Sequence, residues 1–409
     1  TNSGTAAGFG ATGAASWDTT VKTSGFTAVS GVGYFVNTTA GAISVNLPAG
    51  SAGDVVAIKD YAKTFDTHNV TLVQNGSDKI GGSTTNATLS TEGIAVTLVF
   101  VDSTQGWLVT DDGLQSAVIQ PEFITATGGT PTTDGNFKVH TFTAPGTFTV
   151  CSTGNPAGSN EVSYMVVAGG GGGGQGTGSA PQTAGGGGAG GYREGKTPQC
   201  TYTSSPLTCT SGSNNGLPVA VASYPVVVGG GGAGQCSAAR GGAGSVSTFS
   251  TITSAGGGGG GDYNGGGCAG GSGGGGGAPG VPGGTGNSPP VSPAQGFNGG
   301  AGDPVGGGGG GGAAEVGEVA PGGGFGGFGG CGVATSITGS SLGRSGGGAG
   351  GTCRNAPPSP VPFGGGTSGV PATSGGTNTG GGGGASSPPR SPSGAGGSGI
   401  VVIRYKFQN

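Results

Sequence analysis

Apolar and polar residues alternate in short segments between residues 32 and 112. Segments such as AISVNLP, DVVAIKDY and IAVTLVFV are separated by polar, glycine-containing segments such as AGSAGD and QNGSDKIGG. A two-residue period bounded by turn-forming residues is typical of β-strands. Within IAVTLVFV, Val96, Leu98 and Phe100 share one face and the other face is also largely apolar. This predicts a central strand that is covered on both sides.

We interpret residues 31–114 as a small β-sandwich and residues 1–30 as an N-terminal connecting segment. Asn75-Gly76 lies between apolar runs, which favours a hairpin there. The segment FKVHTFTAPGTFTV alternates on both sides of an Ala-Pro-Gly turn and predicts a second hairpin. Residues 115–168 are therefore a linker followed by a hairpin base. His140 has no acidic or cysteine neighbour in this segment, so we expect a structural role for it.

Further apolar segments lead directly into glycine. VSYMVVA is followed by six glycines, and strand-like segments at 218–229 and 245–256 also run into glycine. The chain leaves the glycine-rich region through GIVVIRYKF. We predict a β base from which glycine segments extend and to which they return. Met165 and Val167 should then lie in the same base as Val402 or Ile403.

Composition divides the chain into at least two regions. Of 409 residues 109 are glycine, and most of these follow residue 161. Glycine runs recur over residues 169–398, separated by Pro-, Ser- and Thr-containing connections, and residues 399–409 form a closing strand. There is no strict Gly-X-Y period, which excludes collagen.

Two interpretations of the glycine runs compete. One is a flexible linker, which avoids the entropic cost of ordering glycine. The other is a lattice of polyglycine II helices with three residues per turn, whose outward N–H and C=O groups bond neighbouring helices. Few charges, several aromatic residues and the return to an apolar strand favour packing. The predicted fold class is all-β plus a polyglycine II helix lattice carried by the β base.

Charge and motif content exclude several classes of function. The net charge is −4 and no basic run is present, so nucleic-acid binding is not expected. No window approaches 18 apolar residues, so we expect no membrane-spanning helix. His68 and His140 are the only histidines and no cysteines have CxxC spacing, so no metal is expected. The GxGxxG-like strings follow from composition and predict no cofactor.

Catalysis is not predicted either. Two histidines in β regions do not build a Ser/His/Asp set. The carboxylate pairs Asp111-Asp112 and Glu315 with Glu318 have no acid–base context, and we interpret them as parts of solvated turns. We therefore do not expect an enzyme.

All seven cysteines lie at or after Cys151. Cys200 and Cys209 flank the loop TYTSSPLT and are a candidate disulfide if the protein works in an oxidising exterior. Small buried thiols are an equal alternative. An odd number of cysteines leaves at least one unpaired.

Recognition remains, because exposed loops on a rigid scaffold are the usual place for binding. The candidate binding residues are aromatic side chains set in glycine: Tyr192, Tyr263, Phe297, Phe325, Phe328 and Phe363. The alternative is that these rings pack against the faces of the lattice and seal them.

Two parts of the sequence resemble known proteins. GYFVNTTAGAISVNLPAGSAGDVVAIKDY with STEGIAVTLVFVDSTQGWLV resembles modules of tail-fibre proteins of marine tailed bacteriophages. VSYMVVAGGGGGG, YPVVVGGGGAG and GGSGIVVIRY resemble the glycine-rich domain of phage and bacterial surface proteins. The glycine part is also similar in plan to the tip adhesins of T-even-like long tail fibres.

The resemblance implies a structural virion protein, a tail-fibre or adhesin subunit whose loops between glycine runs recognise the host surface. Implied partners are other fibre or tail proteins and a host receptor, either a glycan or an outer-membrane protein. A homo-oligomer, with a trimer favoured, and a location exposed on the virion are also implied. The alternatives are a decoration or head-fibre protein without a receptor and, less favoured, a depolymerase of surface glycans.

Overall fold

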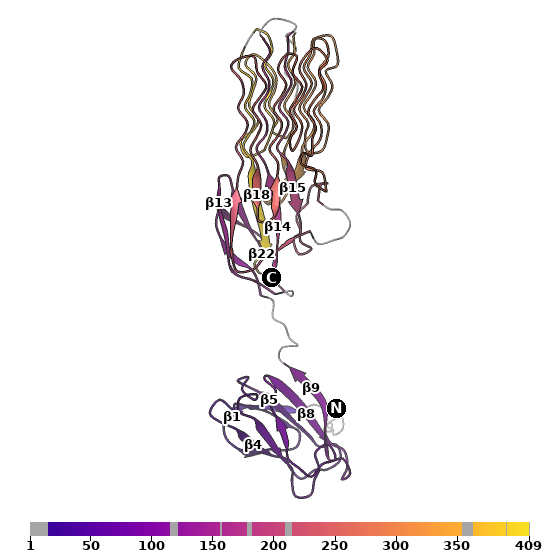
Figure 1. Ribbon diagram of the computed structural model, residues 1–409. Coiled ribbons are helices and arrows are strands. Elements are labelled where there is room, and N and C mark those ends of the chain that lie inside the picture. Colours follow the sequence, from indigo (N-terminus) through magenta and orange to yellow (C-terminus); the bar gives the residue numbers. More distant parts are fainter. Residues whose placement is uncertain are drawn as a thin grey trace, which may run out of the picture. The chain divides into compact units, whose positions relative to one another are not determined.

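The computed structural model describes residues 15–114, 122–155, 158–177, 182–208, 215–353, 363–389 and 391–408. Across these ranges the chain is all-β and contains no helix. It forms two compact units, Thr1–Gln120 and Pro121–Asn409, which are drawn in Figure 1.

The first unit contains two sheets. One has the order β1 (Ser16–Lys22), β3 (Val32–Val36), β5 (Val55–Asp60), β8 (Ile94–Phe100) and β9 (Trp107–Leu114). The other has the order β2 (Phe26–Thr27), β4 (Ile43–Asn46), β6 (Val70–Val73) and β7 (Ala87–Leu89). From β1 to β6 the chain alternates between the sheets, so neighbouring strands of one sheet run parallel.

The alternating apolar positions of both sheets form one core. Val36, Val45, Ile58 and Trp107 in this core are fully buried. Strand β8 lies between β5 and β9 in its sheet, with one face buried and the other half-buried. The segment 1–30, expected to be a connector, contains β1 and β2, which pair with β3 and β4.

The predicted turn at Asn75-Gly76 exists, but the hairpin around it is wide. Gly76 has a φ of 57°, and the Asp78 N–H donates to the Asn75 carbonyl over 2.9 Å. Strands β6 and β7 pair antiparallel, yet all of residues 74–86 connect them. The turn is therefore where the sequence predicts it. The connection between the two strands is much longer than a tight hairpin loop.

The second unit begins with a base of two sheets. One has the order β10 (Thr125–Thr127), β13 (Gly146–Ser152), β17 (Ser223–Val227), β18 (Ser247–Phe249) and β19 (Ile252–Ser254). The other has the order β11 (Thr130–Asp134), β12 (Phe137–Phe142), β22 (Ile400–Lys406), β14 (Glu161–Val167) and β15 (Tyr192–Gly195), with β16 (Leu217–Pro218) also on β14. Strands β20 (Val333–Thr335) and β21 (Leu342–Arg344) form a separate pair.

The predicted hairpin at residues 137–150 is wrong, because β12 and β13 belong to different sheets. The intervening turn carries the chain across the core, where Phe142 and Phe148 lie in one buried cluster. The edge of β12 is occupied instead by β22, from the far end of the chain. The hairpin partner of β12 is β11, joined to it through Gly135, whose φ is 56°.

The prediction that the strands entering and leaving the glycine region share one base is confirmed, and the two strands pair directly. In the antiparallel pair β14–β22, Met165 lies opposite Val402 and Val167 opposite Ile400. Alternate residues of β22 face two different buried clusters. This strand is therefore covered on both faces, which explains its unbroken apolar sequence.

The glycine runs extend side by side from the strands of this base (Figure 1). We call the runs between residues 169 and 398 the glycine array. Successive N–H groups of one run donate to three different neighbours in turn. In residues 169–174, the first and fourth N–H groups bond residues 242–245, the second and fifth bond 394–397, and the third and sixth bond 185–188, over 2.8–3.0 Å. The flexible-linker interpretation is wrong for these runs.

Close backbone contact explains why the runs are glycine. A Cβ added to Gly170 would lie 2.1 Å from the carbonyl oxygen of Gly381, and one added to Gly310 would lie 1.9 Å from that of Gly187. Atoms cannot approach this closely, so a side chain requires neighbouring backbone to move. Hydrogen bonds to other neighbouring runs satisfy the buried N–H and C=O groups of these glycines, which belong to no sheet.

His140 has the structural role expected of it. It is buried, its Nδ1 lies 2.7 Å from the Gly128 carbonyl oxygen, and its Nε2 lies 3.1 Å from the Tyr405 hydroxyl. The Nδ1–H therefore donates to the carbonyl and Nε2 accepts from the hydroxyl. Burial lowers the pKa of His140 from its usual 6.5.

We expect His140→Gln to reduce the pH dependence of unfolding of the second unit. Since the folded pKa is depressed, the unfolded state takes up the proton first as the pH falls below about 6.5. Wild-type stability contributed by neutral His140 is therefore lost on acidification from pH 7 to 5, and the variant should lose less over this range. Denaturant titrations at several pH values measure this, with His68→Gln in the first unit as control. Equal slopes for wild type and His140→Gln would contradict the prediction.

Candidate binding sites

The six predicted aromatic residues occupy different environments. Tyr192 is buried at the start of β15, in the base and not in a loop. Tyr263, Phe297 and Phe363 are half-buried. Phe363 packs over the glycine backbone, since a Cβ added to Gly343 would overlap its ring. Phe325 and Phe328 are exposed by 46% and 47%, so of the six only these two present large apolar surfaces to solvent.

Phe325 and Phe328 belong to one run with a three-residue pattern. In the segment FGGFGGC the two phenylalanines are exposed, Cys331 is half-buried and all four glycines are buried. The buried glycines face other runs: the N–H groups of Gly327 and Gly330 donate to Gly307 and Gly310. Every third side chain therefore lies on the same outer face.

A neighbouring run carries two further exposed apolar side chains. Residues 314–320, AEVGEVA, lie alongside because the Glu318 N–H donates to the Phe328 carbonyl over 2.9 Å. Val316 and Val319, again three apart, are exposed by 53% and 56%. We call Val316, Val319, Phe325 and Phe328 the apolar strip.

Two carboxylates beside the apolar strip accept hydrogen bonds from backbone N–H groups of the run that contains Phe325 and Phe328. Oε2 of Glu318 accepts the Phe328 N–H over 2.9 Å, and Oε2 of Glu315 accepts the Cys331 N–H over 3.3 Å. The hydrogen bond from the Cys331 thiol to Glu315 raises the pKa of Cys331. The interpretation of these acids as parts of solvated turns was thus incomplete, since they are exposed but hold an adjacent run. For Asp111-Asp112 the predicted turn is wrong, because both residues are exposed but lie in strand β9.

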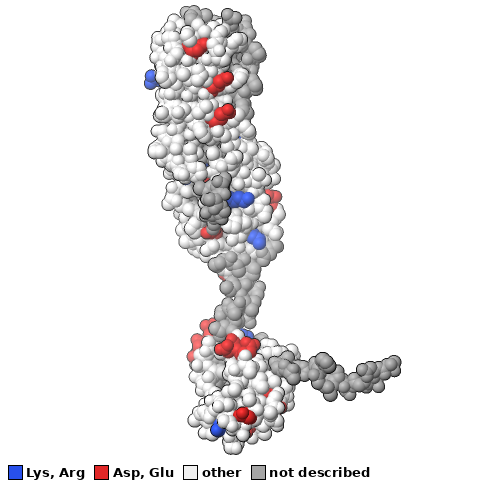
Figure 2. All heavy atoms as spheres, turned by 90° about the vertical axis from the view of Figure 1, so that its right-hand side faces the viewer, with Lys and Arg blue, Asp and Glu red and all other residues white. Residues whose placement is uncertain are grey.

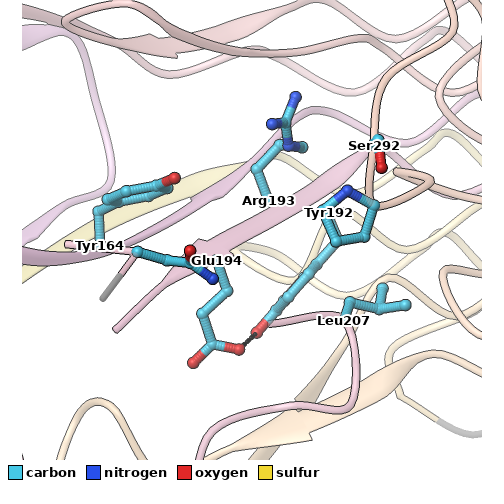
Figure 3. Close-up of a pocket in the computed structure, with 8 residues that line it drawn as sticks. Tyr164, Tyr192, Arg193, Glu194, Leu207 and Ser292 are labelled. Carbon is cyan, nitrogen blue, oxygen red and sulfur yellow. Dashed lines mark hydrogen bonds between the residues drawn. The ribbon is translucent and has the colours of Figure 1, made fainter. Parts of the chain in front are cut away.

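A pocket of about 190 Å³ lies in the base and is drawn in Figure 3. Its lining residues are Tyr164, Tyr192, Arg193, Glu194, Leu207, Asn215, Ser292 and Pro293. Figure 3 shows the side chains of Tyr192 and Glu194 on one side of strand β15 and that of Arg193 on the other. These residues come from distant parts of the chain, and of them only Tyr192 is among the binding residues predicted from the sequence.

The carboxylate beside this pocket forms hydrogen bonds with other residues of the protein. Glu194 is buried and accepts hydrogen bonds from the Tyr192 hydroxyl, the Ser205 N–H and the Thr335 hydroxyl over 2.8–2.9 Å. Burial, with a smaller contribution from Glu194, raises the pKa of Tyr192 well above its usual value. Both carboxylate oxygens of Glu194 are thus engaged within the protein, which leaves it unsuited to acid–base chemistry on a ligand.

Among the described residues no group of His, Cys, Asp and Glu side chains could hold a metal ion. No helix capable of crossing a membrane occurs in the same part of the chain. Cys200 is buried. Its candidate partner Cys209 lies outside the described residues, so the disulfide prediction stays a prediction.

The sequence profile of the glycine-rich domain family matches residues 142–406. The chain belongs to this family. The glycine-rich domain thus spans the base from the end of β12 to the end of β22, together with the whole glycine array. The apolar strip and the pocket both lie within the glycine-rich domain. A search of curated proteins finds no match to the chain.

Proposed function

We propose that the chain is a structural virion protein of a tailed bacteriophage, a fibre or adhesin subunit exposed on the particle. The observation that carries the proposal is a solvent-facing aromatic and aliphatic strip on a backbone array that has little freedom to move. Contiguous exposed apolar surface that is bordered by polar residues is a mark of interaction sites. Other fibre or tail proteins, a host receptor and a homotrimeric assembly belong to the same proposal.

We infer further that the array is a lattice of polyglycine II helices and that the first unit is a β-sandwich. Support for the lattice comes from the period of three in the inter-run hydrogen bonds and in the exposure of FGGFGGC. Support for the sandwich comes from the single core shared by the two sheets of the first unit.

A second candidate is a decoration or head-fibre protein without a receptor. The burial of Tyr192 and the packing of Phe363 on glycine favour it, because these rings seal the domain instead of binding. A surface-glycan depolymerase is the least favoured, since the carboxylates of Glu315 and Glu318 hold an adjacent run.

The test has two parts and uses the full chain. Antibodies raised against it and imaged by electron microscopy should label the tail fibres or tail tip of the particle that carries it. Purified chain in excess should compete with these particles for adsorption to their host cells. Labelling of the head without competition would favour decoration, and absence from the particle would overturn the proposed function.

A further inference from the structure

We propose that the apolar strip binds a linear, uncharged polysaccharide that lies along the axis of the runs. This deepens the proposed function by naming the chemical class of ligand and the surface that takes it. It places the contact on the flank of the array, where residues 314–320 and 325–331 lie together, and not in the turns between runs.

The spacing of the strip suits a repeating ligand. Phe325 and Phe328 are one turn of a three-residue helix apart, or about 9 Å at a rise of about 3.1 Å per residue. Val316 and Val319 repeat with the same period on the adjacent run. The apolar C–H faces of sugar rings in a linear polysaccharide also recur at regular intervals, and each can lie on a ring or branched side chain.

The strip also offers acceptors for sugar hydroxyls. Oε2 of Glu318 is engaged by the Phe328 N–H. Oε1 of Glu318 has no hydrogen-bond partner within the described ranges, and a carboxylate oxygen can accept from a hydroxyl. Because this carboxylate is already held by the adjacent run, binding a hydroxyl costs little side-chain entropy.

Charge determines which polysaccharide fits. Between Arg240 and Arg344 the sequence has no lysine or arginine, whereas it has Asp262, Asp303, Glu315 and Glu318. Figure 2 shows acidic side chains in a row down one face of the array, with few basic ones nearby. An anionic polysaccharide would meet like charge along this face, so the ligand is an uncharged one.

A second copy of the chain fits the strip less well. A two-fold interface would bring Glu315 and Glu318 of each copy against the same residues of the other. Four partly exposed side chains also fall well short of the roughly 800 Å² per partner of a stable interface. A protein receptor remains an outcome of the test.

The experiment is binding of the full chain to an array of linear hexasaccharides, uncharged and anionic, followed by calorimetry on those that bind. We expect binding to uncharged members only. Phe325→Ala and Phe328→Ala should each weaken it about tenfold, whereas Phe328→Tyr, which keeps the ring, should stay close to wild type. Glu315→Gln with Glu318→Gln should admit anionic members.

The controls separate the strip from general loss of fold. Val316→Ser should weaken binding, and Val246→Ser, at a valine elsewhere in the domain that is exposed by 48%, should not. Thermal melts confirm that each variant is folded. No binding to any uncharged hexasaccharide, or binding unaffected by Phe325→Ala and Phe328→Ala, would overturn the inference. If antibodies label the fibres but no saccharide binds, the polysaccharide inference is overturned, the proposed function stands, and a protein receptor is the better candidate. If saccharide binds but the particle is not labelled, the proposed function is overturned and saccharide binding by the apolar strip stands.

Discussion

Gly310→Ala is expected to lower the free energy of unfolding of the glycine-rich domain by about 3 kcal/mol or more. The added Cβ would lie 1.9 Å from the Gly187 carbonyl oxygen and 2.4 Å from its carbonyl carbon. In most cores a flexible side chain moves aside, but here the obstacle is backbone. The carbonyl of Gly310 accepts from Gly330 and its N–H donates to Gly348, so relief of the clash disturbs several runs at once.

Gly230→Ala is the matched control. Gly230 belongs to the run that starts at Gly229, is exposed, and has no atom within 4 Å of the position of an added Cβ. Alanine there should be neutral or stabilise by about 0.5 kcal/mol, because it reduces the freedom of the unfolded chain. Denaturant unfolding of both variants gives the comparison. If Gly310→Ala were as stable as Gly230→Ala, the close packing of the array would be refuted.

Glu194→Ala is expected to destabilise the domain by about 3–5 kcal/mol. The carboxylate accepts three hydrogen bonds in a buried site, and its removal leaves the Tyr192 hydroxyl and the Thr335 hydroxyl without that partner. Arg344 is also buried; burial lowers the pKa of Arg344, and the charge of Glu194 opposes that shift. Without Glu194 the guanidinium would remain buried with less compensation.

The control for this change is the adjacent residue. Arg193 is half-buried on the opposite side of β15, so Arg193→Ala should cost no more than about 1 kcal/mol. The double variant Glu194→Met with Arg344→Met should recover part of the loss by removing both charges. Thermal melts decide the matter: a Glu194→Ala variant as stable as Arg193→Ala would show that this carboxylate does not hold the base together.

Local patterns in the sequence predicted the strands and one association between distant segments, but they failed at a supposed local hairpin. The apolar runs at 162–168 and 399–407 indicated one base, and β14 and β22 do pair. The supposed hairpin at 137–150 failed because β22, more than 250 residues away in sequence, takes the edge of β12. A two-residue period fixes which face of a strand is buried and carries no information on which strand lies beside it.

The candidate surfaces were predictable only in part. The glycine neighbours of Phe325 and Phe328 mark them as candidates, but their exposure follows from the three-residue pattern FGGFGGC. Tyr192 has the same glycine surroundings, and pairing of β15 with β14 buries it. Glycine neighbours alone therefore do not distinguish a surface ring from a core ring.

The bonding of buried runs such as 169–174 to three neighbours in turn restricts how this family can change in evolution. Adding or removing one residue within such a run would rotate each later residue toward the next of its three neighbours. In the run from Phe325 to Cys331 that rotation would direct the rings into neighbouring backbone and expose glycine. Length differences between related domains should therefore accumulate in the connecting turns, and within runs only as multiples of three residues.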